Sequence, residues 1–480
     1  MNFIIFMPDE LRAESMGCYG HPLDVTPNLD AFAAQGTRFD QCHVQHTVCS
    51  PSRCSMLTGW YPHVRGHRTL WHLLRPDEPN LFRYLREAGY DVHWFGKNDA
   101  LSPESFASSV NEAGSKGRGY PFGPSPWSPE DPQYYSFLHE PWTDSLDHHS
   151  DQANVQAAID ILRNRSGTTD RPFVLYLPLI YPHCPYSAPE PWHSRFQPEQ
   201  VVDGLRPANL PRKPSFHSSM RELRRLDQCP EGLFAKVNAV YLGMTAFNDH
   251  LFGRLMDELE SSPFRDDTTV LYLSDHGDYA GDYGLVEKWP SAAEDVITRV
   301  PLIIRTPGGR EGHVVAEQVE LFDIMPTILG LAGVEARHTH FARDLTPQLQ
   351  GRTGDPDRMV FTEGGYDPHE PHCFEGRNED WGELHPYWPK LTLQQRDAGT
   401  IGRTATVRTS THKLTRRHGD ISELYDLVGD PLETVNLIDQ PQYQGIQREL
   451  ELVLLDWYLT TSDVTPFDEN PRGHTFRRRP

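Results

Sequence analysis

The 480-residue sequence has no hydrophobic run that approaches the roughly 20 apolar residues needed to cross a bilayer. At its start only residues 3–7 are apolar before Pro8 and Asp9, which is shorter than a signal-peptide core and has no basic lead. The stretch fits a first buried strand better. We therefore expect a cytoplasmic protein with no membrane among its partners.

Positive charge is also scarce. The chain has 45 Lys and Arg against 67 Asp and Glu, a formal charge of −22. A surface this acidic argues against nucleic acid as a partner. If the substrate is an anion, positive charge must be concentrated locally at the site.

Cysteine is sparse and scattered: the seven cysteines form neither an even disulfide framework nor a pair with zinc-ribbon spacing. Six of them are best explained as small buried side chains. Cys49 differs because of its neighbours. The sequence also lacks internal repeats and low-complexity tracts.

Apolar runs alternate with helical stretches along the first three quarters of the chain. Strands are expected at residues 3–7, 173–177, 268–273 and 300–304, and helices from Thr26-Pro27 and from 80–88. Continuous apolar strands separated by helices are typical of an α/β fold with a mostly parallel central sheet that is covered on both faces.

Three segments rich in Pro, Ser and aromatic residues interrupt this pattern, at 104–150, 184–235 and 364–395. We expect them to be surface insertions that form substrate walls. The later part predicts short strands at 404–413 and 423–427 and a helix at 443–458. We therefore expect two domains, residues 1–375 and a small α+β domain at 376–480 with an antiparallel sheet and a helix.

Two pairs of polar residues directly follow predicted strands: Asp9-Glu10 and Asp275-His276. Ligands bind beyond the carboxyl ends of parallel strands, so both pairs could converge on one divalent cation. Carboxylates favour calcium, magnesium or manganese, and His276 shifts the choice slightly away from calcium. Alternatively, each Asp is an ordinary turn residue or helix cap.

Cys49 precedes a predicted helix at 50–57, in which Pro51 suits the first turn. Its place at a helix N-terminus favours a bound anion. Arg53 lies about one turn away and could hold Cys49 or its product. A buried structural thiol and a low-pKa thiolate nucleophile are the alternatives.

The run Cys49-Ser50-Pro51-Ser52-Arg53, followed by 57–59 (Leu-Thr-Gly), resembles the sulfatase signature, in which the cysteine is oxidised to formylglycine. Further segments are similar to that family, in family order along nearly the whole chain: 17–20, 26–30, 89–90, 96–97, 182–185, 274–277, Lys288, 423–427 and 430–437. The resemblance implies the alkaline-phosphatase-like α/β sandwich.

The resemblance also implies an activity, the hydrolysis of aryl or carbohydrate sulfate monoesters, and a partner, a formylglycine-generating enzyme. The hydrated aldehyde would attack sulfur with one hydroxyl, and its second hydroxyl would let the ester cleave itself without an added water. Calcium is the expected metal, with manganese and magnesium as alternatives.

Site roles follow from the same resemblance. Metal ligands would be Asp9, Glu10, Asp275, His276 and the modified Cys49. Arg53 would stabilise the hydrate, and Lys97, His183 and Lys288 would surround the sulfate and protonate the leaving oxygen.

Three departures from the family pattern matter. Glu10 stands where most sulfatases have a second Asp, and its longer side chain changes its reach to the metal. Asp99 replaces the usual histidine base; it could accept a proton, because its ordinary pKa is about 3.9, but it would repel sulfate. Asp-His-Gly at 275–277 is also found in the phosphonate monoester hydrolase and phosphodiesterase branch, which makes that activity the main alternative.

A loop with His67, Arg68, Trp71 and His72 resembles a substrate loop, and we expect His67 and His72 to bind substrate; a solvated loop with one anchored Trp is the alternative. The long insertions and the basic run at 477–479 favour a homo-oligomer. A rival of another class is a non-catalytic binder of sulfated glycans with an unconverted Cys49.

Overall fold

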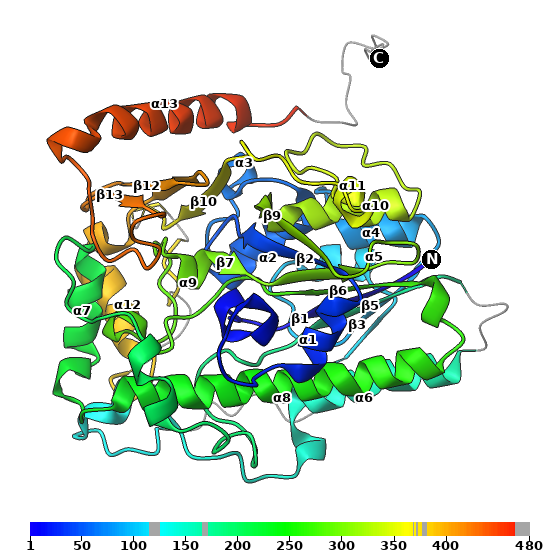
Figure 1. The fold of residues 1–480 in the computed structure, drawn as a ribbon, viewed down its shortest axis with the longest axis horizontal. Coiled ribbons are helices and arrows are strands. Elements are labelled where there is room, and N and C mark those ends of the chain that lie inside the picture. The colour runs from blue at the N-terminus through cyan, green and yellow to red at the C-terminus, as the bar shows by residue number, and fades with distance from the viewer. Residues whose placement is uncertain (115–124, 166–170, 368, 371–372, 377–381, 466–480) are drawn as a thin grey trace.

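The first strand lies in the middle of a nine-stranded sheet (Figure 1). The computed structural model describes residues 1–114, 125–165, 171–367, 369–370, 373–376 and 382–465. Strand β1 (Asn2–Met7) runs parallel to β5 (Phe173–Pro178) on one side and to β6 (Thr268–Leu273) on the other. The three strands predicted as buried apolar runs are therefore direct neighbours.

The sheet is mixed towards one edge. Beyond β5 it continues in parallel with β3 (Asp91–Trp94) and β4 (Glu112–Ala113). Beyond β6 follow β8 (Leu302–Arg305), β2 (Thr37–His43), β7 (Arg299–Val300) and β9 (His313–Glu320). Strand β8 is antiparallel to both of its neighbours. The strand predicted at 300–304 is thus split at Pro301, which has no N–H for a sheet hydrogen bond.

Helices cover both faces, as expected, because β1 is buried on both sides. Ile4 and Phe6 belong to one hydrophobic cluster, and Phe3 and Ile5 to the other, as the alternation of side chains along a strand requires. The first face carries α1 (Pro27–Ala34), α6 (Ser150–Asn164) and α8 (Leu233–Ser261). The second carries α2 (Cys49–Thr58), α4 (Leu81–Glu87), α5 (Pro103–Ser109) and α10 (Ile324–Leu331) (Figure 1).

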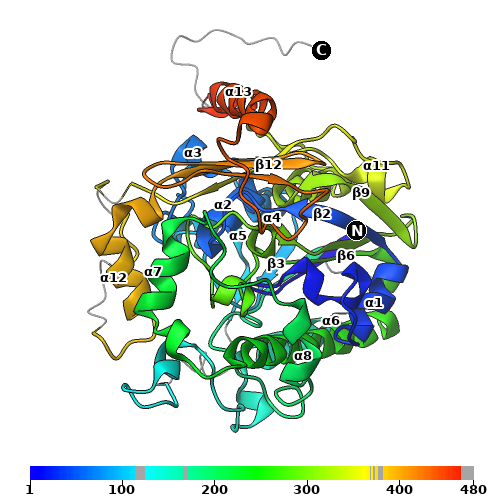
Figure 2. The same ribbon diagram turned by 60° about the vertical axis from the view of Figure 1, so that its left-hand side comes forward.

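A separate antiparallel sheet has the order β10 (Val360–Gly364), β11 (Thr404–Arg408), β12 (His412–Arg417) and β13 (Glu423–Asp426). Helix α13 (Gln444–Thr461) lies across it (Figure 2). The predicted strand at 404–413 is in fact a hairpin of β11 and β12. Strand β10 precedes residue 376, and the division into domains at that position stays a prediction.

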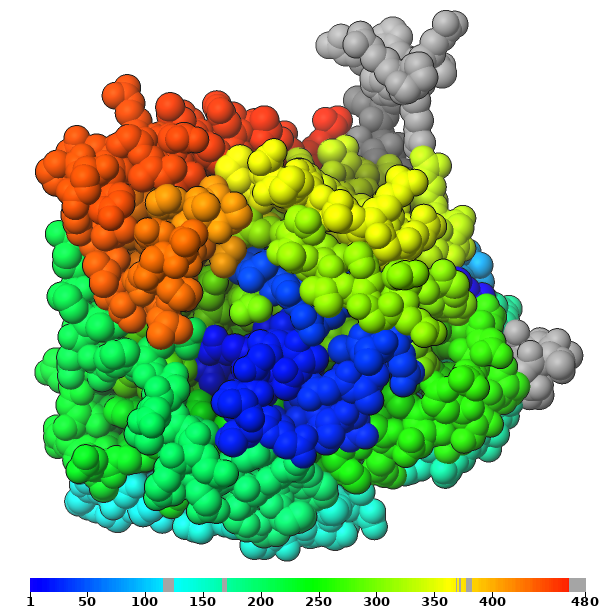
Figure 3. Space-filling view, viewed as in Figure 1, coloured from blue at the N-terminus to red at the C-terminus, as the bar shows by residue number. Residues whose placement is uncertain are grey.

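The insertions contribute further helices, of which α7 (Ser215–Leu223) and α12 (Trp388–Arg396) lie side by side (Figures 1 and 2). The remaining short helices are α3 (Pro62–Arg65), α9 (Asp295–Thr298) and α11 (Thr346–Leu349). In the space-filling view the C-terminal residues, in orange and red, cover one end of the molecule (Figure 3). Within the described ranges, no helix is both long and apolar enough to cross a membrane. The basic run at 477–479 lies outside these ranges.

Candidate active site

The two predicted polar pairs meet at the carboxyl ends of β1 and β6. Because these strands are parallel neighbours, Asp9-Glu10 and Asp275-His276 leave the sheet at the same edge. All four side chains are fully buried. The backbone N–H of Glu10 donates to Oδ1 of Asp275, at 3.3 Å, and joins the two turns directly.

Helix α2 brings Cys49 to this edge. The helix begins at Cys49, with Pro51 in its first turn as predicted, and ends at Gly59 in the left-handed conformation. The Cys49 Sγ lies 3.4 Å from Oδ1 of Asp9 and 3.2 Å from Nε2 of His276. Burial, and next the Asp9 charge, raise the pKa of the thiol well above its ordinary value. A low-pKa thiolate is therefore disfavoured in this geometry.

Arg53, one turn into α2, bridges the two aspartates. Its Nε donates to Oδ2 of Asp275 at 2.7 Å, and its Nη2 donates to Oδ2 of Asp9 at 3.0 Å. All three side chains are fully buried. The guanidinium therefore balances two carboxylates that would otherwise repel each other, and its hydrogen bonds go to these aspartates rather than to Cys49.

The donor set suits a divalent cation. One ligand atom from each of Asp9, Cys49, Asp275 and His276 lies within 4.8 Å of the others. The Nδ1 of His276 lies 2.8 Å from the Gly277 carbonyl, which assigns its proton to that nitrogen and leaves the Nε2 lone pair facing the cluster. Burial lowers the pKa of His276, so the imidazole is neutral, as a metal ligand must be.

Glu10 belongs to a neighbouring cluster. The left-handed backbone at Glu10, with φ of 66°, turns its side chain to an ion pair with Lys288. Its Oε1 is also 3.2 Å from Nε2 of His183. The proposed metal contact of Glu10 stays a prediction, and the longer side chain uses its reach towards these two residues instead.

Three nitrogen-bearing side chains gather around Cys49, although the whole chain is acidic. The Nζ of Lys97 lies 2.7 Å from Oδ2 of Asp9 and 3.5 Å from Sγ of Cys49. The Nε2 of His183 lies 3.1 Å from Nζ of Lys288. The two lysines place positive charge beside Cys49, which an anionic substrate requires.

The environment sets the charge of each of these groups. Burial lowers the pKa of Lys288, but the neighbouring carboxylates, Glu10 above all, outweigh burial and raise it well above its ordinary value. Burial, and then the Lys288 charge, lower the pKa of His183 well below its ordinary value. At neutral pH the site therefore contains a charged lysine beside a neutral imidazole.

Asp99 pairs with Lys97, the lysine next to Cys49. Its Oδ2 lies 2.9 Å from Nζ of Lys97, which also pairs with Asp9. Burial lowers the pKa of Lys97, and the two carboxylates outweigh burial and raise it. The ion pair with Lys97 thus partly offsets the repulsion that we expected Asp99 to exert on sulfate.

A cavity of about 350 Å³ opens onto this cluster. Its lining contains the predicted residues Cys49, Lys97, Asp99, His183 and Lys288. Seven further lining residues were not predicted individually: Leu70, Ile180, Glu287, Glu375, Tyr387, Lys390 and Leu391. Four of them lie in the insertion at 364–395 that we expected to form a substrate wall: Glu375, Tyr387, Lys390 and Leu391. The amino-acid composition of residues 364–395 pointed to the segment as a whole, but no sequence motif pointed to these individual residues.

His67 and His72 are not among the residues that line this cavity. The Nδ1 of His67 lies 2.6 Å from the carbonyl of His72, and its Nε2 lies 3.2 Å from Glu78. Both histidines thereby fix the shape of the loop, and Leu70 is the loop residue that lines the cavity. Substrate binding by the two histidines stays a prediction.

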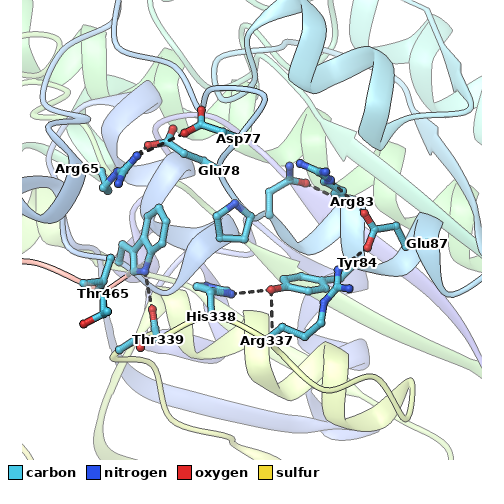
Figure 4. Close-up of a pocket in the computed structure, with 14 residues that line it drawn as sticks. Arg65, Asp77, Glu78, Arg83, Tyr84, Glu87, Arg337, His338, Thr339 and Thr465 are labelled. Carbon is cyan, nitrogen blue, oxygen red and sulfur yellow. Dashed lines mark hydrogen bonds and ion pairs between the residues drawn. The ribbon is translucent and has the colours of Figure 1, made fainter. Parts of the chain in front are cut away.

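A second cavity of similar volume, about 350 Å³, lies beside α4 (Figure 4). Its polar groups already have protein partners: Tyr84 bonds Nδ1 of His338 at 2.9 Å, and Trp60 donates to the Thr339 carbonyl at 2.7 Å. Arg337 pairs with Glu87 at 2.6 Å. The residues that line it include no cysteine or serine nucleophile, so the first cavity is the candidate active site.

Comparison with known proteins identifies relatives across nearly the whole chain. The sulfatase family model matches residues 1–334. An uncharacterised sulfatase from Escherichia coli (strain K12) is 26% identical over 475 residues, which cover 95% of this chain and 86% of that protein. A multifunctional alkaline phosphatase superfamily protein from Trinickia caryophylli is 26% identical over 540 residues, with 98% and 96% covered.

Among solved structures, the phosphonate monoester hydrolase of Agrobacterium radiobacter superposes with a TM-score of 0.75 at 22% identity, covering 96% of each chain. This likeness shows a shared fold, the alkaline-phosphatase-like α/β architecture.

Proposed function

Because the chain belongs to the sulfatase family and is a sulfuric ester hydrolase, we propose that it cleaves aryl or carbohydrate sulfate monoesters with a formylglycine made from Cys49. The observation that carries the proposal is the place of Cys49. It is the first residue of α2, buried, and within 3.4 Å of both Asp9 and His276. The partner that would convert it is a formylglycine-generating enzyme.

The bound cation would be held by Asp9, Asp275, His276 and the converted Cys49. Calcium is the expected ion, with manganese and magnesium as alternatives, since two carboxylates and one imidazole accept all three. When present, the cation and the hydrated aldehyde supply a polarised oxygen nucleophile.

The chain's own cations would bind and orient the sulfate. Lys97 and Lys288 flank Cys49 and remain charged, so they offset the charge that develops on the sulfate oxygens. Their positions are fixed by Asp9 and Glu10, which reduces the reorganisation needed during reaction.

The leaving alcohol needs a proton, and Lys288 is the group that holds one at neutral pH. Its Nζ is 3.1 Å from Nε2 of His183, whose lone pair accepts a hydrogen bond from the ammonium group and orients it, and water returns the proton that Lys288 gives up. The Nδ1 of His183 lies 2.5 Å from the Cys184 carbonyl, which fixes the ring orientation. We assign the donation of this proton to Lys288 and the orientation of its ammonium group to His183.

The test is to replace Cys49 by alanine in protein made together with a formylglycine-generating enzyme. We expect kcat/KM on an aryl sulfate to fall on the order of 10³-fold or more, because the nucleophile is lost. Mass spectrometry of the peptide around residue 49 should show an aldehyde in the wild type. Cys54→Ala is the matched control, since Cys54 is buried in the same helix and its thiol donates to the Ala100 carbonyl. Full activity of Cys49→Ala would refute the proposal.

A second candidate is the hydrolysis of phosphonate monoesters or phosphodiesters by the same groups. It is favoured by the Asp-His-Gly run at 275–277 and by the fold shared with the phosphonate monoester hydrolase. Sulfate monoesters and phosphodiesters both carry one negative charge, so one pocket suits both. Comparing kcat/KM for aryl sulfate, aryl phosphonate and phosphodiester substrates separates the two activities.

A further inference from the structure

Part of the active-site cavity is apolar, although its base is highly charged. Leu70, Ile180, Tyr387 and Leu391 line it together with the charged groups around Cys49. They come from three segments that are distant in sequence: the loop after α3, the turn after β5, and the beginning of α12. We refer to these four residues as the apolar wall.

The apolar wall is held in place by specific contacts. The indole N–H of Trp71, next to Leu70, donates to the carbonyls of Phe374 and Glu375 at 3.1 and 3.0 Å. This ties the loop to residues 374–375, and Glu375 in turn accepts a hydrogen bond from Gln394 of α12 at 2.8 Å. The two sides of the wall are therefore fixed relative to each other.

Helix α12 is in turn anchored beside the catalytic lysine. The Nζ of Lys390 lies 2.6 Å from Oε1 of Glu287, and Nη2 of Arg224 lies 3.0 Å from Oε2 of the same carboxylate. Glu287 directly precedes Lys288 in the chain. Leu391 is thus placed at a fixed position with respect to Lys288.

The charged groups of the cavity near the wall already have protein partners. Lys390 pairs with Glu287, and Oε2 of Glu375 accepts from Gln394 at 2.8 Å. Asp99 pairs with Lys97. A polyhydroxylated alcohol would lose hydrogen bonds to water here, at about 1–3 kcal/mol for each group left unsatisfied.

Binding of an apolar ring is instead favoured, by roughly 25 cal/mol of free energy for each Å² of apolar surface that leaves water. We propose that the apolar wall is the subsite for an uncharged, aromatic alcohol, and that Leu70 and Leu391 determine this specificity. The inference rests on the proposed sulfatase function and narrows its substrate class from aryl or carbohydrate esters to aryl esters.

The experiment compares a phenyl sulfate and a hexosamine sulfate in the wild type and in Leu391→Asn. Phenols are better leaving groups than sugars, so the two kcat/KM values cannot be compared directly. The informative quantity is the change that the substitution makes in the ratio of kcat/KM for the phenyl ester to kcat/KM for the hexosamine ester. We expect kcat/KM for the phenyl ester to fall on the order of 10-fold, mainly through KM, and that for the hexosamine ester to change less than about two-fold. Leu384→Asn is the control, because Leu384 is 65% exposed and does not line the cavity.

Equal losses on both substrates, or no loss on either, would overturn the inference. Leu70→Asn repeats the test from the other side of the wall if Leu391→Asn does not fold. The failure of the proposed function is distinguishable: the wild type would then hydrolyse neither ester. In that case we would measure the binding of phenol by calorimetry, to Cys49→Ala and to the double variant that also carries Leu391→Asn. Weaker binding to the double variant supports the inference, and equal binding refutes it.

Discussion

Arg53 is the residue on which the charge balance of the site depends. It bridges Asp9 and Asp275 with no exposure to solvent, so each of the three charges is compensated only within the protein. A divalent cation in the neighbouring cluster would compensate the same two carboxylates from another side. Arginine and cation therefore share the task of stabilising one pair of buried charges.

This sharing predicts the effect of Arg53→Met. Removing one partner of a buried ion pair costs about 3–5 kcal/mol, so the metal-free variant should unfold at a lower denaturant concentration than the wild type. Added Ca²⁺ or Mn²⁺ should raise the stability of the variant more than that of the wild type, because the cation replaces the lost charge. Urea unfolding with EDTA and with each ion measures both effects.

Arg224→Met is the matched control for this prediction. Arg224 is equally buried, but it pairs with Glu287 outside the cation cluster. It should lose stability without an increased response to the ion. An equal ion response in both variants would show that Arg53 and the cation do not act on the same carboxylates.

At the residue scale, the sequence predicted that Asp9, Cys49, Asp275 and His276 come together, but it did not predict where every neighbouring side chain points. Cys49 was found by its place at the start of a predicted helix and by the sulfatase-like run at 49–53, and Arg53 by its position one turn further along that helix. Glu10 was expected beside Asp9, but adjacent residues diverge when the backbone turns left-handed, and nothing in the residue type announces a φ of 66°. Leu391 contributes only surface to the cavity, so no motif marked it.

Among the helices and strands, α2 leaves the least room for substitution. It is buried along its full length, and Gly59 ends it in a left-handed conformation with φ of 69°. A Cβ at Gly59 would lie 2.9 Å from Cε of Met325 and 3.0 Å from Cβ of His340. Both the backbone and the packing therefore require glycine at this position.

Gly59→Ala should destabilise the protein for two separable reasons. The left-handed backbone costs about 1 kcal/mol for alanine, and crowding in a packed core adds about 1–3 kcal/mol. Gly66→Ala isolates the first cost, because Gly66 ends α3 with φ of 82° but has no atom near its added Cβ. The difference in unfolding free energy between the variants measures crowding. If the two variants are equally stable, the packing argument fails.

The order of elements was predictable, whereas strand direction was not. The run at 300–304 reads as a buried strand whether its neighbours are parallel or antiparallel, since both faces are covered in either case. The run at 404–413 was read as one strand, because Thr409 to Thr411 contain no Gly or Pro to mark the hairpin turn. The direction of a strand and the position of a turn depend on tertiary contacts, which the hydrophobic periodicity of the sequence does not reveal.

Across the whole molecule, buried ion pairs join the small sheet to the main body. Asp295, the first residue of α9, lies 2.8 Å from Nζ of Lys413 and 3.1 Å from Nη2 of Arg408, which belong to β12 and β11. Burial raises the pKa of Asp295, but the charges of Arg408 and Lys413 outweigh burial and hold it well below its ordinary value. This carboxylate links the two sheets only while it is ionised.

Asp295→Asn should therefore weaken the attachment of the small sheet, by about 3–5 kcal/mol of unfolding free energy at neutral pH. The pKa is lower in the folded than in the unfolded chain, so the stabilisation is complete above the unfolded value of about 3.9 and is lost as pH falls below it towards the folded pKa. The difference in unfolding free energy between wild type and variant should accordingly close in acid.

Urea titrations from pH 7 to the lowest pH at which the wild type stays folded measure this difference. Asp355→Asn is the control: it removes an exposed ion pair with Arg343, and we expect it to change the stability little. A gap that stayed constant as the pH fell well below 3.9 would mean that packing of the Asp295 side chain, rather than its charge, connects the two sheets.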